Sequence, residues 1–262
     1  MKKVTAFVGS ARKRHTYAAV QQFLNNLKLF GDVEYEIVVL SDHRIEICRG
    51  CSLCLNKGEE LCPLKDHRDE LIEKIMSSDG VVIASPNYSF QVSAITKAFL
   101  DRLGFVFHRP RFFGKAFTSI VAQGVYGGGK IVKYLDFVGR GLGFNTVMGT
   151  SITTREPLSS KRQAKIGKTL SRQSARFHKR LMGPAYPVPP LSKLFLFRMS
   201  RTTVMALDES YRDYNYYRDK GWFDSEYYYP IHLNVLKKIT GRLADSLATR
   251  MAEKSSQTVS GS

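Results

Sequence analysis

Solid apolar runs that alternate with amphipathic segments dominate the first 155 residues, and this alternation most constrains the fold. Five runs have the character of buried strands, over residues 4–9, 33–40, 80–85, 116–121 and 145–152. Between them, apolar residues recur at helical spacing over residues 17–29, 66–77, 92–103 and 131–142. Parallel neighbours need a helical crossover and are covered on both faces. The pattern therefore predicts an α/β fold, a doubly wound sheet of five parallel strands.

The character of the chain changes after the fifth run. Residues 159–181 form a predicted basic helix with an apolar stripe that packs on the sheet. The proline-rich segment 183–190 cannot be helical, and helices are predicted again over 191–207 and 233–251. The sequence thus predicts a sheet domain over 1–182, a helical C-terminal extension over 183–254 and a disordered polar tail over 255–262.

Charge is strongly positive and unevenly placed. The formal net charge is +17, and Glu156 alone opposes a run of Lys and Arg residues between Arg155 and Arg201. Such a block suits nucleic acid, acidic lipid or a phosphorylated cofactor, or it is simply a solvated helix face. The first apolar run is too short for a signal peptide, and no run approaches the ~20 residues of a membrane span. We therefore expect a cytoplasmic protein.

The turn after the first strand has the features of a phosphate site. It reads Gly9-Ser10-Ala11-Arg12-Lys13-Arg14-His15-Thr16 and leads directly into a helix. Free N–H groups at a helix N-terminus, small residues and an arginine favour a bound phosphate. The Gly-Lys-Ser/Thr and dinucleotide glycine signatures are missing, so an FMN-type monophosphate fits best. The alternative is an ordinary turn capped by Thr16.

Two later loops follow strands three and four, at the edge where doubly wound sheets bind ligands. The first reads Ser85-Pro86-Asn87-Tyr88-Ser89-Phe90, and it offers a polar group and an aromatic face to a flavin ring. The second, over residues 122–129, is rich in glycine, which lets backbone amides approach a planar ring. No catalytic side chain is expected, because a flavin carries the chemistry. The predicted cofactor-binding residues are Ser10, Arg12, His15, Thr16, Pro86, Asn87, Tyr88, Ser89, Gln123, Gly124, Tyr126 and Gly127.

These motifs, over roughly residues 1–155, resemble the NADPH-dependent FMN reductase family of flavodoxin-like NAD(P)H oxidoreductases. The likeness lies in the Gly-Ser-x-Arg turn before Thr16, in Pro86-x-Tyr88, and in a following helix with Lys97 and Asp101-Arg102. The resemblance assigns the FMN phosphate to Ser10, Arg12 and Thr16. The family often has Gly and Asn where Arg14 and His15 stand, so their roles do not carry over. Lys97, Asp101 and Arg102 are interpreted as structural ion-pairing residues.

The resemblance also implies a set of functional expectations. It implies strand order 2-1-3-4-5, FMN as cofactor and NAD(P)H as co-substrate. Hydride passes from the nicotinamide to FMN, and electrons then pass to a small-molecule or protein acceptor. A homo-oligomer is expected from fold-level analogy.

All four cysteines lie within residues 48–62, as Cys48, Cys51, Cys54 and Cys62. Two-residue gaps followed by a distant cysteine before proline fit a 4Fe–4S cluster, and the run resembles that of iron-sulfur flavoproteins. Structural or redox thiols and a zinc site are the alternatives. With a cluster, the chain would be an iron-sulfur flavoprotein that carries electrons.

Three roles are open for the C-terminal extension. It is a lid or dimer arm, a peripheral membrane contact with residues 194–197 as its buried edge, or a nucleic-acid surface. Packing is favoured, because aromatic stripes at helical spacing usually pack, and nucleic acid is not expected. The non-enzymatic alternative for the whole chain is a basic module that binds anions or nucleic acid on the same fold.

Overall fold

The computed structural model describes the backbone of residues 1–259 and the side chains of residues 1–251. The chain divides into two compact units. The core unit comprises Met1–Arg49 and Leu64–Ala185, and the C-terminal unit comprises Gly50–Pro63 and Tyr186–Ser262. The boundary after Ala185 lies close to the predicted one. The grouping of Gly50–Pro63 with the C-terminal residues was not predicted.

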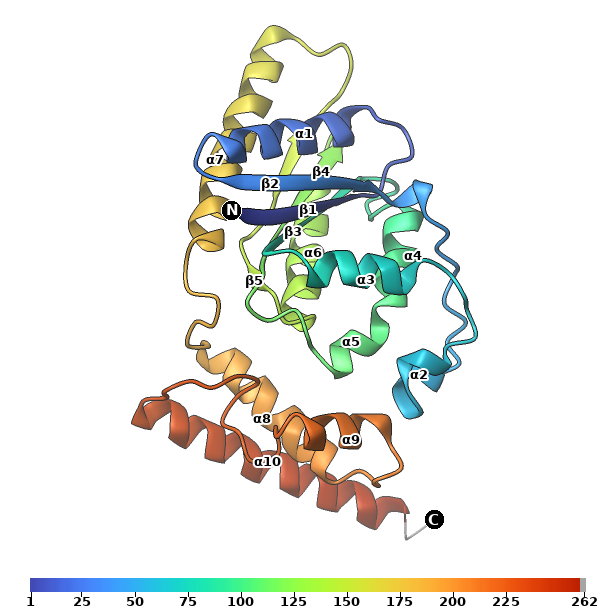
Figure 1. The fold of residues 1–262 in the computed structure, drawn as a ribbon, viewed down its shortest axis with the longest axis vertical. Helices are drawn as coiled ribbons and strands as arrows, with labels where there is room; N and C mark the ends of the chain where they lie inside the picture. Colours follow the sequence, from blue (N-terminus) through green and yellow to red (C-terminus); the bar gives the residue numbers. More distant parts are fainter. Residues whose placement is uncertain (260–262) are drawn as a thin grey trace. The chain divides into compact units, whose positions relative to one another are not determined.

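The core unit is built on a parallel sheet (Figure 1). Its strands are β1 (Lys2–Val8), β2 (Val33–Val39), β3 (Gly80–Pro86), β4 (Ala116–Gln123), β5 (Asn145–Thr146) and β6 (Thr150–Thr153). They follow the order β2-β1-β3-β4-β5, and β6 also pairs with β4. All these pairings are parallel. The predicted fold and order are confirmed.

The predicted fifth strand is split into β5 and β6, both of which pair with β4. Between them, a Cβ at Gly149 would lie 2.3 Å from the carbonyl oxygen of Ser119. The carbonyl of Met148 accepts a hydrogen bond (2.9 Å) from Nε2 of Gln173, a buried side chain. The break therefore exists because a buried amide replaces part of the strand ladder.

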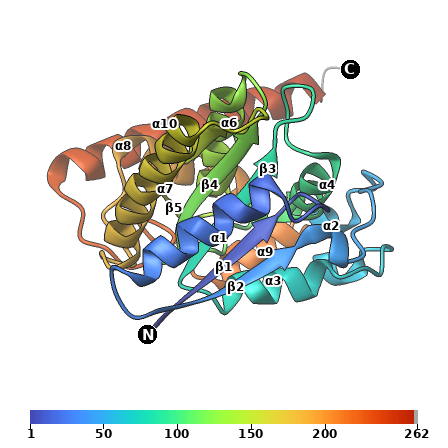
Figure 2. The ribbon, with the colours of Figure 1, turned by 90° about the horizontal axis from the view of Figure 1, so that it is seen from above.

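Helices cover both faces of the sheet (Figures 1 and 2). On one face lie α1 (His15–Lys28) and α7 (Ser160–Leu181), and on the other lie α3 (Arg68–Met76), α4 (Ala94–Arg102) and α6 (Gly128–Gly141). Short helices η1 (Leu40–Asp42) and α5 (Gly104–His108) complete the unit. The predicted basic helix thus packs on the sheet, as its stripe indicates.

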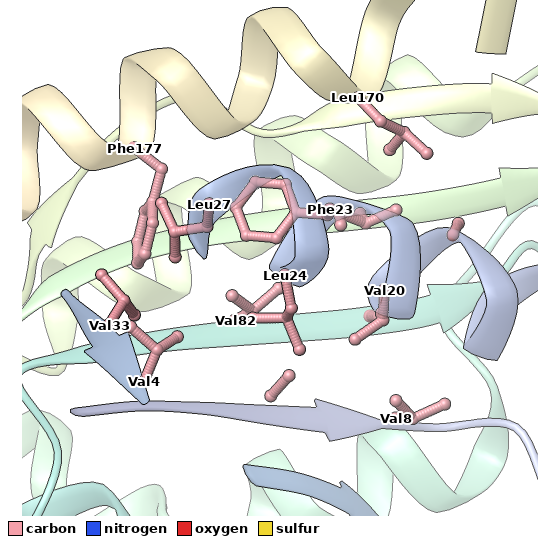
Figure 3. Close-up of a cluster of buried hydrophobic side chains, with 14 of the residues drawn as sticks. Val4, Val8, Val20, Phe23, Leu24, Leu27, Val33, Val82, Leu170 and Phe177 are labelled. Atoms are coloured by element: carbon pink, nitrogen blue, oxygen red, sulfur yellow. The ribbon is translucent and has the colours of Figure 1, made fainter. Parts of the chain in front are cut away.

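A cluster of buried side chains lies under α1 and α7 (Figure 3). Val4, Val8 and Val82 face the helices from the strands. Phe23 and Phe177 come from the two helices, with ring centroids 5.7 Å apart. Every second strand residue points to the opposite face of the sheet. There, Phe7 of β1 stacks on Phe99 of α4, with ring centroids 5.2 Å apart. Burial on both faces explains why the strands are continuous apolar runs.

The C-terminal unit is helical, with α2 (Leu53–Asn56), η2 (Glu59–Leu61), α8 (Leu191–Met205), α9 (Arg212–Asp219) and α10 (Val235–Val259). Helices α8 and α10 pack against each other, and Leu194 and Phe197 of α8 and Ala248 of α10 are buried. Residues 194–197 were the expected buried edge of a membrane contact, one of the three open roles of the extension. This expectation is wrong for Leu194 and Phe197, which lie in the interior of this unit. Helix α10 continues into the predicted tail, and residues 260–262 lie outside the described residues.

Within the described residues, the structure has no helix that combines the length and the apolar character needed to cross a bilayer.

Candidate functional site

The first loop leaves β1 through a position that only glycine fits. The Gly9 N–H donates to the carbonyl of Ala84 (2.8 Å), and Oγ of Ser93 donates to the Gly9 carbonyl (2.6 Å). A Cβ at Gly9 would lie 1.7 Å from Oγ1 of Thr96. The start of the loop is therefore held firmly between β3 and α4. The next residue, Ser10, donates its hydroxyl to the Arg12 carbonyl (2.7 Å) and tightens the turn.

Helix α1 begins without a side-chain cap. Arg14 occupies the N-cap position, no side chain bonds to the first N–H groups there, and the first turn contains no acidic residue. The predicted alternative of a turn capped by Thr16 is therefore wrong, because Thr16 lies inside the first turn, where it is buried. An uncapped N-terminus keeps its N–H groups and its positive dipole end available to an anion.

The loop after β3 is a tight, strained turn. The backbone N–H groups of Tyr88 and Gln91 donate to each other's carbonyls at 3.0 and 2.9 Å. Between them, Ser89 and Phe90 adopt positive φ angles of 48° and 62°, which side-chain-bearing residues rarely adopt. Strained turns of this kind concentrate at ligand sites, and this one leaves the ring of Tyr88 half exposed.

Asn87 connects this loop to the next one. Its backbone N–H donates to the Ala122 carbonyl (2.7 Å), and its Nδ2 donates to the Tyr126 carbonyl (2.8 Å). Its Oδ1 is buried and has no hydrogen-bond partner among the described residues. A buried acceptor without a donor is costly, and a ligand N–H would satisfy it.

The loop after β4 is fixed by Gln123. Its Oε1 accepts the N–H of Gly128 at 2.6 Å, and its Nε2 donates to Oγ1 of Thr153 at 3.2 Å. At Gly127, φ is 94°, and a Cβ would meet the ring of Phe90 at 2.8 Å, so glycine is required there. The rings of Phe90 and Tyr126 lie 5.1 Å apart. The second and third loops are thus joined into one structure.

The three loops enclose a hollow of about 280 Å³ at the carboxyl ends of the strands. Its lining comprises Ser10, Arg12, Arg14, His15, Thr16, Pro86, Asn87, Tyr88, Ala122, Gln123, Gly124 and Thr154. The structure therefore brings together the predicted cofactor-binding residues, except Ser89, Tyr126 and Gly127, which shape the loops behind the lining. Two arginines line the hollow, and none of its lining residues is acidic.

Arg14, Ala122 and Thr154 were absent from the predicted set. Ala122 and Thr154 stand at the carboxyl ends of β4 and β6, the edge where ligands bind, so the strand-end rule signals both. His15 has a partner that the sequence did not indicate: its Nε2 lies 3.1 Å from a carboxylate oxygen of Glu156. This contact joins the first loop to the loop that precedes α7.

The residues interpreted as structural do form ion pairs. Nζ of Lys97 lies 2.5 Å from Asp101 on the same helix. Arg102 instead crosses to the buried Asp66, with Nε and a terminal nitrogen donating to its two oxygens at 3.0 and 2.9 Å. Burial acts to raise the pKa of Asp66, but the Arg102 bonds and charge and the Glu46 N–H lower it below its ordinary value overall.

The cysteines occupy different environments. Cys48 and Cys51 are exposed, Cys54 lies half-buried in α2, and Cys62 is buried. Positive φ angles at Gly50 (65°) and Ser52 (57°) reverse the backbone on both sides of Cys51.

A different trio, His43, His67 and Glu70, places one ligand atom from each residue within 4.8 Å of the others. Nδ1 of His67 accepts the Arg44 N–H at 3.1 Å. Nδ1 of His67 is therefore already engaged by the backbone of Arg44.

The sheet order, with a hollow at the switch point, defines a flavodoxin-like α/β protein. Comparison with known proteins makes the assignment more specific: the chain belongs to the NADPH-dependent FMN reductase family, whose model matches residues 2–156. The match ends where α7 begins, so the family covers the three loops but not the C-terminal unit.

The curated proteins that this chain resembles include several named as iron-sulfur flavoproteins. The chain is 39% identical to an iron-sulfur flavoprotein of Archaeoglobus fulgidus over 127 residues, which cover 48% of this chain and 55% of that protein. It is 36% identical to one of Methanocaldococcus jannaschii over 101 residues, which cover 38% of this chain and 51% of that protein. The chain thus matches about half the length of these relatives.

Among solved structures, RosB with a bound 8-demethyl-8-formylriboflavin-5'-phosphate intermediate is similar, with a TM-score of 0.55 and 14% identity. The alignment covers 90% of this chain and 92% of that one. At this identity the likeness supports the fold alone.

Proposed function

We propose that this chain binds FMN in the three-loop hollow and acts as an NAD(P)H-dependent FMN oxidoreductase. The observation that carries the proposal is the convergence of three strand-end loops, distant in sequence, on one hollow with two arginines and no acidic lining. Membership of the NADPH-dependent FMN reductase family supports the same reaction.

The residues present fit the cofactor. The uncapped start of α1, with Arg12 and Thr16, offers N–H groups, a hydroxyl and a guanidinium to a phosphate, and Ser10 holds the turn through its bond to the Arg12 carbonyl. The unsatisfied Oδ1 of Asn87 offers an acceptor to an N–H on the ring edge. Tyr88 offers an aromatic face, and Gly124 permits close backbone approach. When bound, FMN supplies hydride acceptance and onward electron transfer, while these residues bind and orient it.

The test compares FMN affinity in two matched variants. Arg12→Gln should weaken FMN binding at least about tenfold, because a charge-assisted hydrogen bond contributes roughly 1.5–3 kcal/mol. Lys13→Gln should leave it unchanged, because Lys13 lies outside the lining, with Nζ 5.7 Å from the centroid of the Tyr17 ring. Quenching of flavin fluorescence measures both, and NAD(P)H-driven bleaching of the bound flavin measures turnover.

A wild-type protein that stays colourless and refuses added FMN would refute this function. If it also bound duplex DNA with a steep salt dependence, the basic nucleic-acid-binding alternative would take its place. The same proposal includes an electron acceptor, a small molecule or a protein, and a homo-oligomeric state.

A second function is favoured by the cysteine segment and by the names of the curated relatives. We propose that Cys48, Cys51, Cys54 and Cys62 hold a 4Fe–4S cluster, which would make the chain an electron carrier as well. Anaerobically purified protein should then contain about four irons and four labile sulfides per chain, and Cys54→Ser should lose them while retaining FMN. Zinc without sulfide, or metal-free thiols, would contradict the cluster.

A further inference from the structure

Helix α10 of the C-terminal unit carries its small residues on the inside. Gly241, Ala244 and Ala248 are buried, and their spacing places them on one face of the helix. A Cβ at Gly241 would lie 3.4 Å from Nε of Arg198 on α8, so this face is the one that packs on α8. The large apolar residues of α10 therefore lie elsewhere on its surface.

These large apolar residues face the solvent in a row. Each of the six is between 47% and 74% exposed, and they are Val235, Leu236, Ile239, Leu243, Leu247 and Met251. Single exposed apolar residues are ordinary, but a continuous row over about four helical turns marks a contact surface. We call this row the α10 stripe.

The acidic charge of this part of the helix is turned away from the stripe. Asp245 is the single acidic residue within residues 235–251. Its carboxylate accepts hydrogen bonds from Arg198, from a terminal nitrogen of Arg201 at 2.9 Å and from Oγ1 of Thr202 at 3.0 Å. All three partners belong to α8, so Asp245 serves the packing of the two helices.

The charges that border the stripe are positive. Arg242 and Arg250 are exposed and stand three residues after Ile239 and Leu247, which makes them neighbours of the stripe on the helix surface. Among the described residues, neither arginine forms an ion pair. Lys238 is exposed as well, 3.8 Å from a carboxylate oxygen of Glu226. The α10 stripe thus complements a surface that is both apolar and anionic.

Two features disfavour a second copy of α10 as the occupant. Apart from Leu236, the stripe residues recur every four positions, so the stripe turns by about 40° around the helix at each step. A seam between two helices needs apolar residues spaced alternately by three and four. Pairing would also bring Arg242 and Arg250 of two copies together, while Asp245 is engaged by α8. A plane of lipid accepts the broad arc and attracts the cations.

We propose that the α10 stripe is a membrane-contact surface that lies in the interface of a bilayer containing anionic phospholipid. The apolar side chains enter the boundary of the acyl chains, and Arg242 and Arg250 bind headgroup phosphates. This contact goes beyond the proposed oxidoreductase function and does not depend on it. It uses α10 in place of residues 194–197, where Leu194 and Phe197 are interior.

Sedimentation of the full chain with lipid vesicles tests the contact. At about 0.1 M salt, the wild type should bind phosphatidylcholine vesicles with about 30% phosphatidylglycerol at least about tenfold more tightly than phosphatidylcholine alone. Leu243→Asn with Leu247→Asn should weaken this binding at least about tenfold, because two buried apolar side chains are lost. Leu29→Asn with Phe137→Asn is the matched control at exposed residues of the core unit, and it should bind like the wild type.

A second pair of variants tests the charges. Arg242→Gln with Arg250→Gln should weaken binding to the anionic vesicles at least about tenfold and leave binding to phosphatidylcholine unchanged. Its control is Arg172→Gln with Arg176→Gln, at exposed residues of α7. A loss in this control as large as in the α10 variant, with no loss in the leucine variant, would show that the basic core unit binds the vesicles. That result would overturn the proposal.

The depth of insertion gives a readout that does not depend on affinity. Lipids brominated on their acyl chains should quench the fluorescence of Leu243→Trp but not that of Phe137→Trp. The native Trp222, which is buried, supplies a background common to both variants. Equal quenching of the two variants would contradict insertion of the α10 stripe. This measurement also keeps the proposal testable if the double leucine variant does not fold.

Other occupants of the stripe give different results. A wild type that ignores both kinds of vesicle would overturn the proposal. If the double leucine variant then dissociated an oligomer in light scattering, a second copy would be the occupant, and if it only lost stability, the chain's own residues would be. FMN affinity should be the same in all these variants, so a flavin site that fails in the wild type leaves the vesicle results unaffected.

Discussion

At the scale of single residues, the site depends on positions where one side chain, or none, is tolerated. Much of it follows from the sequence, because loops at strand ends are recognised from period changes and from glycine, proline and hydroxyl residues. Ser10, Arg12, Pro86 and Asn87 reach the lining in this way. The partners of these residues do not follow from the sequence, since the His15–Glu156 contact joins residues 141 positions apart.

Gly9 is the first such position, and Gly9→Ala should damage the site more than a single methyl suggests. The added Cβ would lie 1.7 Å from Oγ1 of Thr96 and 2.9 Å from Oγ of Ser93. The first loop must then shift, at a cost of roughly 1–3 kcal/mol in unfolding free energy and with weaker FMN binding. Urea titration and flavin fluorescence measure the two effects. Gly129→Ala is the control, because a Cβ there meets nothing within 4 Å.

Asp66 is the second such position. Asp66→Asn should reduce the free energy of unfolding by roughly 3–5 kcal/mol, because it removes one partner of the buried ion pair with Arg102. Since folding lowers the pKa of Asp66, its contribution is present above the unfolded value of about 3.9 and is lost as pH falls through the folded value. The wild type should therefore lose stability below about pH 4, and the variant should lose less. Denaturant titrations from pH 3 to pH 7 check this, and parallel pH profiles would contradict it.

At the scale of elements, the sheet and its crossover helices follow from the sequence. The split of the fifth strand does not, because it depends on Gln173 of α7 reaching Met148. In the C-terminal unit, the sequence predicts helices close to α8 and α10. It does not predict which face of each helix is buried, because that depends on tertiary packing. Leu194 and Phe197 are interior while Leu196 is exposed, a distinction that a continuous apolar run does not carry.

Helix α7 should be stabilised chiefly by Phe177. Its ring is fully buried, contacts Phe23 and lies so close to the sheet that a Cβ at Gly80 would meet it at 2.8 Å. Phe177→Ala should therefore destabilise the protein by roughly 3–5 kcal/mol, whereas Phe137→Ala, at a ring that is 71% exposed, should change stability by less than about 0.5 kcal/mol. Thermal and urea unfolding measure both, and similar effects would show that α7 does not depend on this contact.

At the scale of the whole molecule, the charge of +17 should act on association rates rather than on the fold. An anion such as FMN should bind more slowly as salt rises, by roughly tenfold between about 0.05 and 0.5 M ionic strength, because screening shortens the reach of the surface charge. Stopped-flow fluorescence measures this rate. Riboflavin, which lacks the phosphate, is the control, and an equal salt effect on it would exclude charge steering.

The sequence by itself determined the alternation of strands and helices, the edge at which a ligand binds and the residue types of the three loops. These follow from local periodicity and from backbone preferences, which act between near neighbours. The tertiary structure alone decided that Arg102 pairs with Asp66, that Gln123 bonds Thr153 and that Gln173 reaches the Met148 carbonyl. Those contacts depend on register and on helix placement, because they join residues that no local pattern relates.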